Sequence, residues 1–164
     1  MAQPPNIIIY TDGAASGNPG PGGYGIVLKA GRRRKELAGG YSHTTNNRME
    51  LLAVIKALEA LKKPGSRVTI YTDSRYVADA VEKGWVFDWE KKGFRKKKNP
   101  DLWKRFLEVY RKHRVEFVWI RGHADIPENE RCDRLAVEAS RRSDLEPDPG
   151  YNAKEDQTLF RAES

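Results

Sequence analysis

Two segments of the sequence are nearly the same pentapeptide, IYTDG at residues 9–13 and IYTDS at residues 70–74. Each follows a short run of β-branched residues, and each places an aspartate just before a Gly or Ser that favours a turn. If the two segments form parallel, neighbouring strands, both aspartates leave the sheet at the same carboxyl edge. Such strands lie about 4.8 Å apart, so Asp12 and Asp73 should lie close together.

Two adjacent carboxylates repel each other, and a polyvalent cation between them removes that penalty. Hard oxygen ligands favour Mg²⁺, with Mn²⁺ as a possible substitute. Aspartates at strand ends also cap turns and helices, which is their commonest role. The repetition weakens that second interpretation without removing it, so both aspartates are candidate metal ligands.

The composition is that of a soluble protein. A chain of 164 residues fits one domain with a real core. The single Cys132 excludes an internal disulfide and fits a reducing cytoplasm. No apolar run approaches the roughly 18 residues that cross a bilayer, and the first five residues do not resemble a signal peptide. We expect a cytoplasmic monomer without membrane contact.

The charge is unevenly distributed. Residues 144–164 hold six acidic and two basic side chains, a net charge of −4, which leaves +11 on residues 1–143 out of the total of +7. The sequence therefore predicts a basic folded domain over 1–143 and an acidic, flexible tail over 144–164. A body this basic favours a polyanionic partner such as nucleic acid, although solubilising charge is the alternative.

The hydrophobic pattern predicts an α/β fold. Strands are expected at residues 7–12, 24–28, 35–41, 67–73 and 115–120, and helices at 51–61, 74–83, 101–114 and 127–143. This order gives a five-stranded mixed sheet with helices on both faces. The first three strands form an antiparallel meander, and the last two run parallel to the first.

Two further segments carry candidate functional side chains. Glu50 is expected in the first turn of a helix, where the helix dipole alone could explain an anion, yet Asn46 and Asn47 before it can bind a sugar or base edge. Asp133 is expected half-buried beside a helix core stripe, which is costly unless it is paired or metal-bound. His123 follows a strand on the same side and could carry protons near neutral pH.

Residues 83–98 carry seven basic side chains against two acidic ones, with aromatic residues between them. The pattern suits contact with a phosphate backbone, although a solvated helix face over core aromatics would look similar. The candidate contacts are Trp85, Trp89, Lys91, Lys92, Lys96, Lys97 and Lys98.

Taken together, the motifs resemble type I ribonuclease H, the enzyme family that cuts the RNA strand of RNA–DNA hybrids. The resemblance covers residues 7–143 and implies the ribonuclease H-like fold. The matching motifs, in family order, are YTDG at 10–13, GNPG at 17–20, TNNRME at 45–50, YTDS at 71–74, GH at 122–123 and ENERCD at 128–133.

The resemblance also implies roles for individual residues. The metal-binding carboxylates would be Asp12, Glu50, Asp73 and Asp133, and the mobile catalytic histidine would be His123. The amides that contact the hybrid would be Asn18, Asn46 and Asn47, and a phosphate of the DNA strand would lie near Thr45 and Asn99. His43 stands where the family often has arginine, and Asp125-Ile126 replaces smaller, more polar residues.

The mechanism implied is hydrolysis with two Mg²⁺ ions about 3.5–4 Å apart, one helping to generate the attacking hydroxide and one stabilising the leaving 3′ oxygen. The products would carry 5′-phosphate and 3′-hydroxyl ends, with little sequence preference. Two rivals are a non-catalytic hybrid-binding module and a DNA-directed nuclease of the same fold. The clustered carboxylates argue against the first rival, and the TNNRME segment with the basic region argues against the second.

Overall fold

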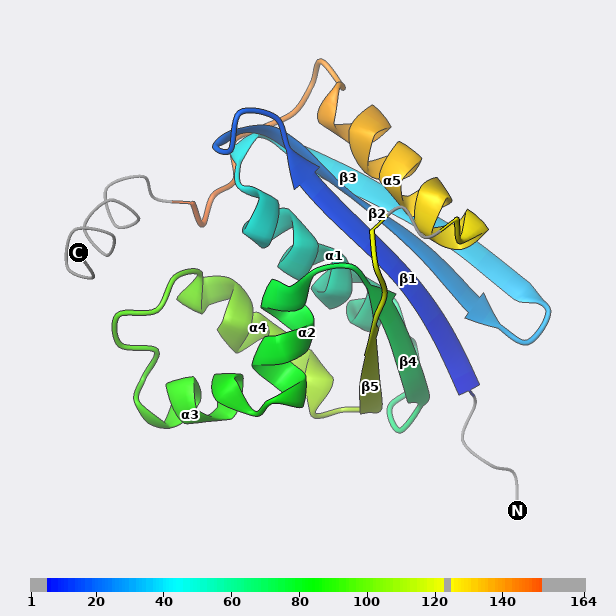
Figure 1. Ribbon diagram of the computed structural model, residues 1–164, viewed down its shortest axis with the longest axis vertical. Coiled ribbons are helices and arrows are strands. Elements are labelled where there is room, and N and C mark those ends of the chain that lie inside the picture. Colours follow the sequence, from blue (N-terminus) through cyan, green and yellow to red (C-terminus); the bar gives the residue numbers. More distant parts are fainter. Residues whose placement is uncertain (1–5, 123–124, 152–164) are drawn as a thin grey trace.

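The computed structural model describes residues 6–122 and 125–151 of the 164-residue chain. Its centre is a five-stranded sheet with the strand order β3-β2-β1-β4-β5 (Figure 1). The strands are β1 (Asn6–Ala15), β2 (Gly20–Ala30), β3 (Arg33–Thr44), β4 (Arg67–Thr72) and β5 (Arg114–Trp119). Strands β1, β2 and β3 pair antiparallel, whereas β4 pairs parallel with β1 and β5. The predicted fold class is confirmed.

The repeated pentapeptides lie side by side in this sheet. Tyr10 pairs with Tyr71 in the parallel register of β1 and β4, and their rings stack with centroids 4.9 Å apart. The prediction that Asp12 ends its strand is wrong. Strand β1 continues to Ala15 because residues 12–15 keep pairing with β2 after the pairing with β4 has stopped. Asp12 therefore projects from rigid, hydrogen-bonded backbone.

The helices are α1 (Asn46–Glu59), α2 (Arg75–Glu82), α3 (Trp85–Lys91), α4 (Pro100–Tyr110) and α5 (Pro127–Ser140). Helices α1 and α5 cover opposite faces of the sheet. Successive residues of a strand face opposite sides, and two adjacent β2 residues contact different helices. A Cβ added to Gly22 would meet the Met49 side chain of α1 at 3.1 Å, and one added to Gly23 would meet the Ala136 carbonyl of α5 at 2.1 Å. The core lies mainly between the sheet and α1, α2 and α4.

Several element boundaries differ from those expected. Helix α3 was not predicted, and α1 begins at Asn46, so Glu50 lies beyond the first turn and the helix dipole no longer accounts for it. Pro127 opens α5 as predicted, but the helix ends at Ser140. Within residues 6–122 and 125–151, no helix is both long and apolar enough to cross a membrane.

The segment after α5 differs most from its prediction. Residues 146–151 pack against the folded body: the Ser42 amide donates to the Glu146 carbonyl at 2.8 Å, and the buried Asp148 contacts Arg48. These residues therefore contact the folded body, whereas the sequence predicted a tail detached from it. Residues 152–164 lie outside the part of the chain that the structure describes.

Candidate active site

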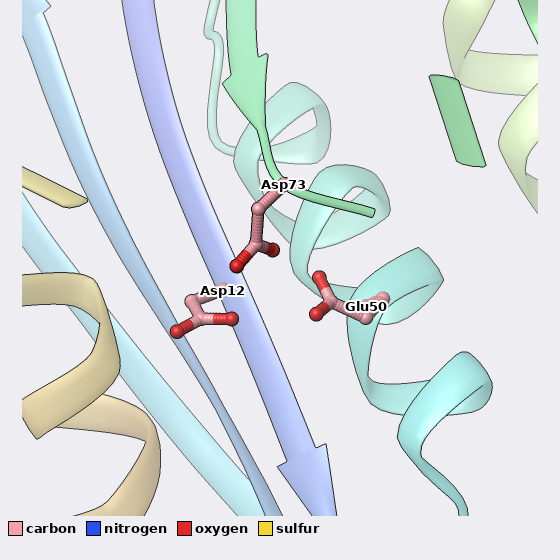
Figure 2. Close-up of side chains that lie close together, drawn as sticks. All are labelled: Asp12, Glu50 and Asp73. Atoms are coloured by element: carbon pink, nitrogen blue, oxygen red, sulfur yellow. The ribbon is translucent and has the colours of Figure 1, made fainter. Parts of the chain in front are cut away.

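Three of the four predicted metal-binding carboxylates point toward one another at the carboxyl edge of the parallel strands. Asp12 comes from β1, Asp73 follows β4, and Glu50 comes from α1 (Figure 2). One oxygen of each lies within 4.8 Å of the others. An open pocket contains all three, and Asn46, Asn47 and Asp133 also line it. The sheet register and one helix thus assemble a cluster from positions far apart in the sequence.

Gly13 allows α1 to approach β1 closely enough to complete this cluster. A Cβ at Gly13 would lie 2.4 Å from the Met49 carbonyl carbon and 2.5 Å from the Glu50 amide nitrogen, so any larger residue would push the helix away. The Gly13 amide also donates to Asp12 Oδ1 at 2.8 Å, which fixes that carboxylate. The glycine after Asp12 in the repeated phrase therefore has a packing role as well as a turn preference.

The electrostatics of the cluster are those of crowded, partly buried acids. Burial, followed by the charge of Asp73, raises the pKa of Asp12 from 3.8 to about 7. Burial, followed by the charges of Asp12 and Asp73, holds the pKa of Glu50 well above its usual range. Without a cation, the protein favours protonated carboxyls here.

The cluster has the donor set of a hard divalent cation. All its ligand atoms are carboxylate oxygens, which Mg²⁺ and Mn²⁺ prefer over nitrogen and sulfur. Glu50 Oε2 is buried and has no hydrogen-bond partner among the described residues, a situation that it shares with Thr11 Oγ1 and Asn129 Oδ1. A cation would satisfy that orphan oxygen and reverse the pKa shifts. Asp12, Glu50 and Asp73 therefore fit the implied metal.

The raised carboxyl pKa values predict an unusual pH dependence of stability in the metal-free protein. A folded-state pKa above the unfolded value stabilises the fold at low pH, and this contribution disappears as the pH rises through about 7. Because one pKa unit is about 1.4 kcal/mol, we expect the unfolding free energy in EDTA to fall by on the order of 2 kcal/mol between pH 5.5 and 8. Mg²⁺ or Mn²⁺ should restore it at pH 8.

Denaturant melts of wild type and Asp12→Asn across this range provide the measurement. The variant also controls for His113, whose pKa burial lowers and whose contribution has the opposite sign. The account requires a flatter pH profile in the variant and higher stability than wild type at pH 8 without metal. Identical pH profiles of stability in wild type and Asp12→Asn would show that the carboxylates do not destabilise the fold by repelling one another.

Asp133 and His123 differ from the three clustered carboxylates Asp12, Glu50 and Asp73, here called the triad. Asp133 lines the same pocket, but its side chain is exposed, which makes the prediction of half-burial wrong. It stands outside the group of oxygens within 4.8 Å of one another. Its charge nevertheless contributes to the raised pKa of Asp12. His123 lies outside the described residues; Gly122 before it places an added Cβ 3.3 Å from Asp73 Oδ2.

The predicted hybrid-contacting amides form a connected group beside the carboxylates. Asn46 Oδ1 accepts from the Ala15 amide at 2.5 Å, and Asn18 Oδ1 accepts from the Asn46 amide at 2.9 Å. Because both amide oxygens are occupied by backbone donors, the side-chain N–H groups are left to donate outward. Asn47 is exposed at the rim of the pocket. Their role in binding stays a prediction.

The basic segment is divided between surface and core. Lys91, Lys92, Lys96, Lys97 and Lys98 are exposed, and α3 with the loop after it projects away from the sheet (Figure 1). Trp85 is 44% exposed, with Lys83 Nζ 5.1 Å from its ring centre. Trp89 instead packs edge-on against the buried Trp103, while Lys97 Nζ lies 5.2 Å from the centre of the Trp89 ring. Trp85 is thus better placed than Trp89 for an external partner.

Sequence reasoning missed Arg75, which lines the carboxylate pocket from the start of α2. Its guanidinium carbon lies 4.0 Å from the centre of the Trp119 ring, and Trp119 Nε1 donates to the Asp73 carbonyl at 3.0 Å. The available signal was its position two residues after the second repeated aspartate. The Arg75 guanidinium reaches the pocket because α2 begins at this residue.

Comparison with known proteins gives one consistent result. The sequence profile of the RNase H family matches residues 4–141. A ribonuclease H of Syntrophus aciditrophicus is 59% identical over 150 residues, which span 88% of this chain and 86% of that protein. A ribonuclease HI of Synechocystis is 51% identical over 158 residues, spanning 92% and 98%.

Solved structures agree. The crystal structure of LC9-RNase H1, described as a type 1 RNase H with the type 2 active-site motif, matches with a TM-score of 0.78 and 30% identity, covering 99% of this chain and 84% of that one. LC11-RNase H1, solved in complex with an RNA/DNA hybrid, matches with a TM-score of 0.61 and 31% identity, covering 81% and 95%. These matches confirm the resemblance seen in the motifs.

Proposed function

The chain belongs to the ribonuclease H family, and on that basis we propose that its domain at residues 1–143 hydrolyses the RNA strand of RNA–DNA hybrids, leaving 5′-phosphate and 3′-hydroxyl ends. The observation that carries this proposal is the convergence of Asp12, Glu50 and Asp73 in one open pocket lined by asparagine amides. We further propose that the protein acts as a cytoplasmic monomer.

Asp12, Glu50 and Asp73 would hold the divalent cations, two in the active complex, with Asp133 contributing from the pocket rim. Bound there, Mg²⁺ supplies Lewis acidity that activates water and neutralises charge on the leaving 3′ oxygen. The protein contributes rigidity: Asp12 is fixed by the Gly13 amide within a paired strand, and Glu50 is held by a helix against that strand. His123, directly after Gly122, is proposed to carry the proton of the leaving group.

Selection of RNA is assigned to Asn18 and Asn46. Their amide oxygens accept backbone hydrogen bonds, so their N–H groups are oriented to donate to a 2′-hydroxyl oxygen, which DNA lacks. Contacts to phosphates and the fit to the groove would supply most of the remaining affinity, and these interactions do not depend on the base sequence. We therefore expect cleavage at many positions of a hybrid.

A gel assay tests the function. RNA–DNA hybrid, duplex RNA and duplex DNA, each labelled on one strand, are incubated with Mg²⁺ or with EDTA. We expect cleavage of the RNA strand of the hybrid alone, only with Mg²⁺, and fragments that a 5′-phosphate-dependent exonuclease degrades. Cleavage of duplex DNA would favour the DNA-directed nuclease, and hybrid binding without cleavage would favour the non-catalytic module.

The exposed lysines after α3 should determine affinity rather than chemistry. Replacing Lys96, Lys97 and Lys98 with Gln should raise KM and spare kcat, because phosphate contacts position the substrate. Each lost contact should reduce the slope of log K against log salt by up to roughly 0.9. Binding titrations at three salt concentrations, with Ca²⁺ replacing Mg²⁺ to limit cleavage, measure that slope.

A matched triple variant at Lys62, Lys63 and Lys112 provides the control. These lysines are also exposed, and Lys62 and Lys112 line a separate pocket that contains none of the triad carboxylates. Their replacement removes the same charge and should change the slope little. Equal slope changes in the two variants would show that the loop lysines attract the hybrid only through the overall charge of the protein. They would then not be part of the binding site.

A further inference from the structure

The segment at residues 146–151, here called the C-terminal strap, is bound to the body beside the candidate substrate site. The Asp148 amide donates to the His43 carbonyl at 3.2 Å, and the Tyr151 ring meets the His43 ring edge-on at 5.3 Å. Asp148 is only 7% exposed. The strap thus runs along the end of β3, immediately before Thr45 and the start of α1.

The strap inserts one carboxylate into a buried ionic network. Arg48 is 2% exposed and donates from Nε to Asp148 Oδ2 at 2.6 Å and from Nη2 to Asp148 Oδ1 at 3.2 Å. Its other edge donates to both oxygens of Asp101, at 2.9 and 2.7 Å. Two bidentate pairs, one on each side, hold the guanidinium plane in one orientation.

Arg48 in turn fixes the side chain of Asn99. Arg48 Nη1 donates to Asn99 Oδ1 at 3.1 Å, and Asn99 Nδ2 donates to the Tyr76 hydroxyl at 3.0 Å. Because a guanidinium has no acceptor, the amide oxygen must face Arg48 and the nitrogen must face away from it. One N–H of Asn99 is left to donate to an anion. Asn99 cannot rotate its amide without losing the bond to Arg48.

The same network holds Thr45. Thr45 Oγ1 caps α1 by accepting from the Arg48 amide at 3.3 Å, and the neighbouring Thr44 Oγ1 donates to Asp148 Oδ2 at 2.7 Å. Asp148 therefore contacts Thr44, which precedes Thr45, and also the side chain of Arg48, whose backbone amide Thr45 binds. Thr45 and Asn99, the two residues expected beside a DNA-strand phosphate, are tied to one carboxylate outside the 1–143 domain.

We propose that Asp148 is a positioning residue for substrate binding: through Arg48 it orients Asn99, and through Thr44 it orients Thr45, to bind one backbone phosphate of the hybrid. This inference rests on the proposed function. It makes Asp148, alone among the strap residues, a support for the binding site from behind Arg48 and Thr44. The chemistry at the carboxylate triad does not depend on it.

The test compares Asp148→Asn with Glu146→Gln. Both variants remove one negative charge from the strap, but Glu146 is exposed and is held through its backbone carbonyl. We expect Asp148→Asn to raise KM for an RNA–DNA hybrid roughly tenfold, with kcat within twofold, and to reduce the salt slope of binding by up to about 0.9, the value of one phosphate contact. Glu146→Gln should match wild type.

A general loss of stability is separated from positioning by a double-mutant cycle. Assays are run at a temperature at which melting curves show both variants folded. In an Asn99→Ala background, Asp148→Asn should add little further loss of affinity, because Asn99 is the main group that it positions. Additive effects would overturn the proposal. If Asp148→Asn does not fold, Thr44→Val is tested in a Thr45→Ala background instead, because Thr44 acts on Thr45; alone it should increase KM two- to fivefold, and in that background it should add little.

The outcome is distinguishable from failure of the proposed function. Wild-type protein that does not cleave the hybrid would contradict the function itself. Wild-type cleavage, combined with an unchanged KM and salt slope in Asp148→Asn, would overturn the positioning role alone.

Discussion

Asp12→Asn is expected to abolish Mg²⁺-dependent cleavage of an RNA–DNA hybrid while leaving hybrid binding intact or tighter. The substitution preserves shape but removes one of three charged oxygens that lie within 4.8 Å of one another. It also removes negative charge from a pocket that must accept a phosphate. We expect kcat to fall by more than about 10³-fold, equivalent to more than 4 kcal/mol of barrier. Single-turnover cleavage and filter binding in Ca²⁺ measure the two effects separately.

Asp133→Asn provides the matched control for this variant. It removes the same charge from the same pocket, but Asp133 is exposed and stands outside the triad. Its effect on kcat should therefore be clearly smaller than that of Asp12→Asn. Cleavage by the Asp12 variant at a rate within about tenfold of wild type would contradict the assignment of Asp12 as a metal ligand. Equal losses in the two variants would instead make Asp133 a full member of the cluster.

His123→Ala is expected to slow cleavage by about 10²–10⁴-fold without abolishing it, the usual contribution of a positioned proton carrier. Gly122, the residue before His123 in the chain, lies beside Asp73 of the carboxylate cluster. If His123 carries protons, the kcat of the variant should depend less on pH than that of wild type.

The pH profile of kcat, measured at saturating hybrid and constant ionic strength, distinguishes a proton carrier from a structural residue. Partial rescue of the alanine variant by added imidazole would support proton transfer. A variant that matched wild type in rate across the whole pH range would make His123 a bystander. Asp125, two positions after it, is exposed and has a backbone φ of 58°, a left-handed conformation that aspartate adopts more readily than most non-glycine residues.

The fold was predictable wherever a local pattern determined it. The helical crossovers made parallel strands possible, and the repeated phrase then placed both aspartates at one edge; β1 and β4 do pair in parallel, with identical residues opposite each other. The apolar period predicted α1, and Pro127 marked the start of α5. Helix α3 was missed because seven residues rich in tryptophan and phenylalanine show no clear helical period.

Long-range contacts account for the other differences. Asp148 and Arg48 are 100 positions apart, and nothing near either residue shows that a buried ion pair joins them. An acidic stretch containing Pro147 and Pro149 is typical of a tail, and one buried carboxylate overrides that composition. Asp133 was expected to be half-buried because it follows Cys132 on the helix, yet the pocket opens on its side.

The central claim is that Asp12, Glu50 and Asp73 hold the divalent cations that support cleavage of the RNA strand. Anomalous diffraction tests it most directly, using crystals of the protein with an RNA–DNA hybrid grown in Ca²⁺, transferred briefly to Mn²⁺ and frozen. The account predicts two Mn²⁺ peaks, each bound by members of this triad and by the same RNA phosphate. Peaks absent from the triad, or bound beside the DNA strand, would contradict it.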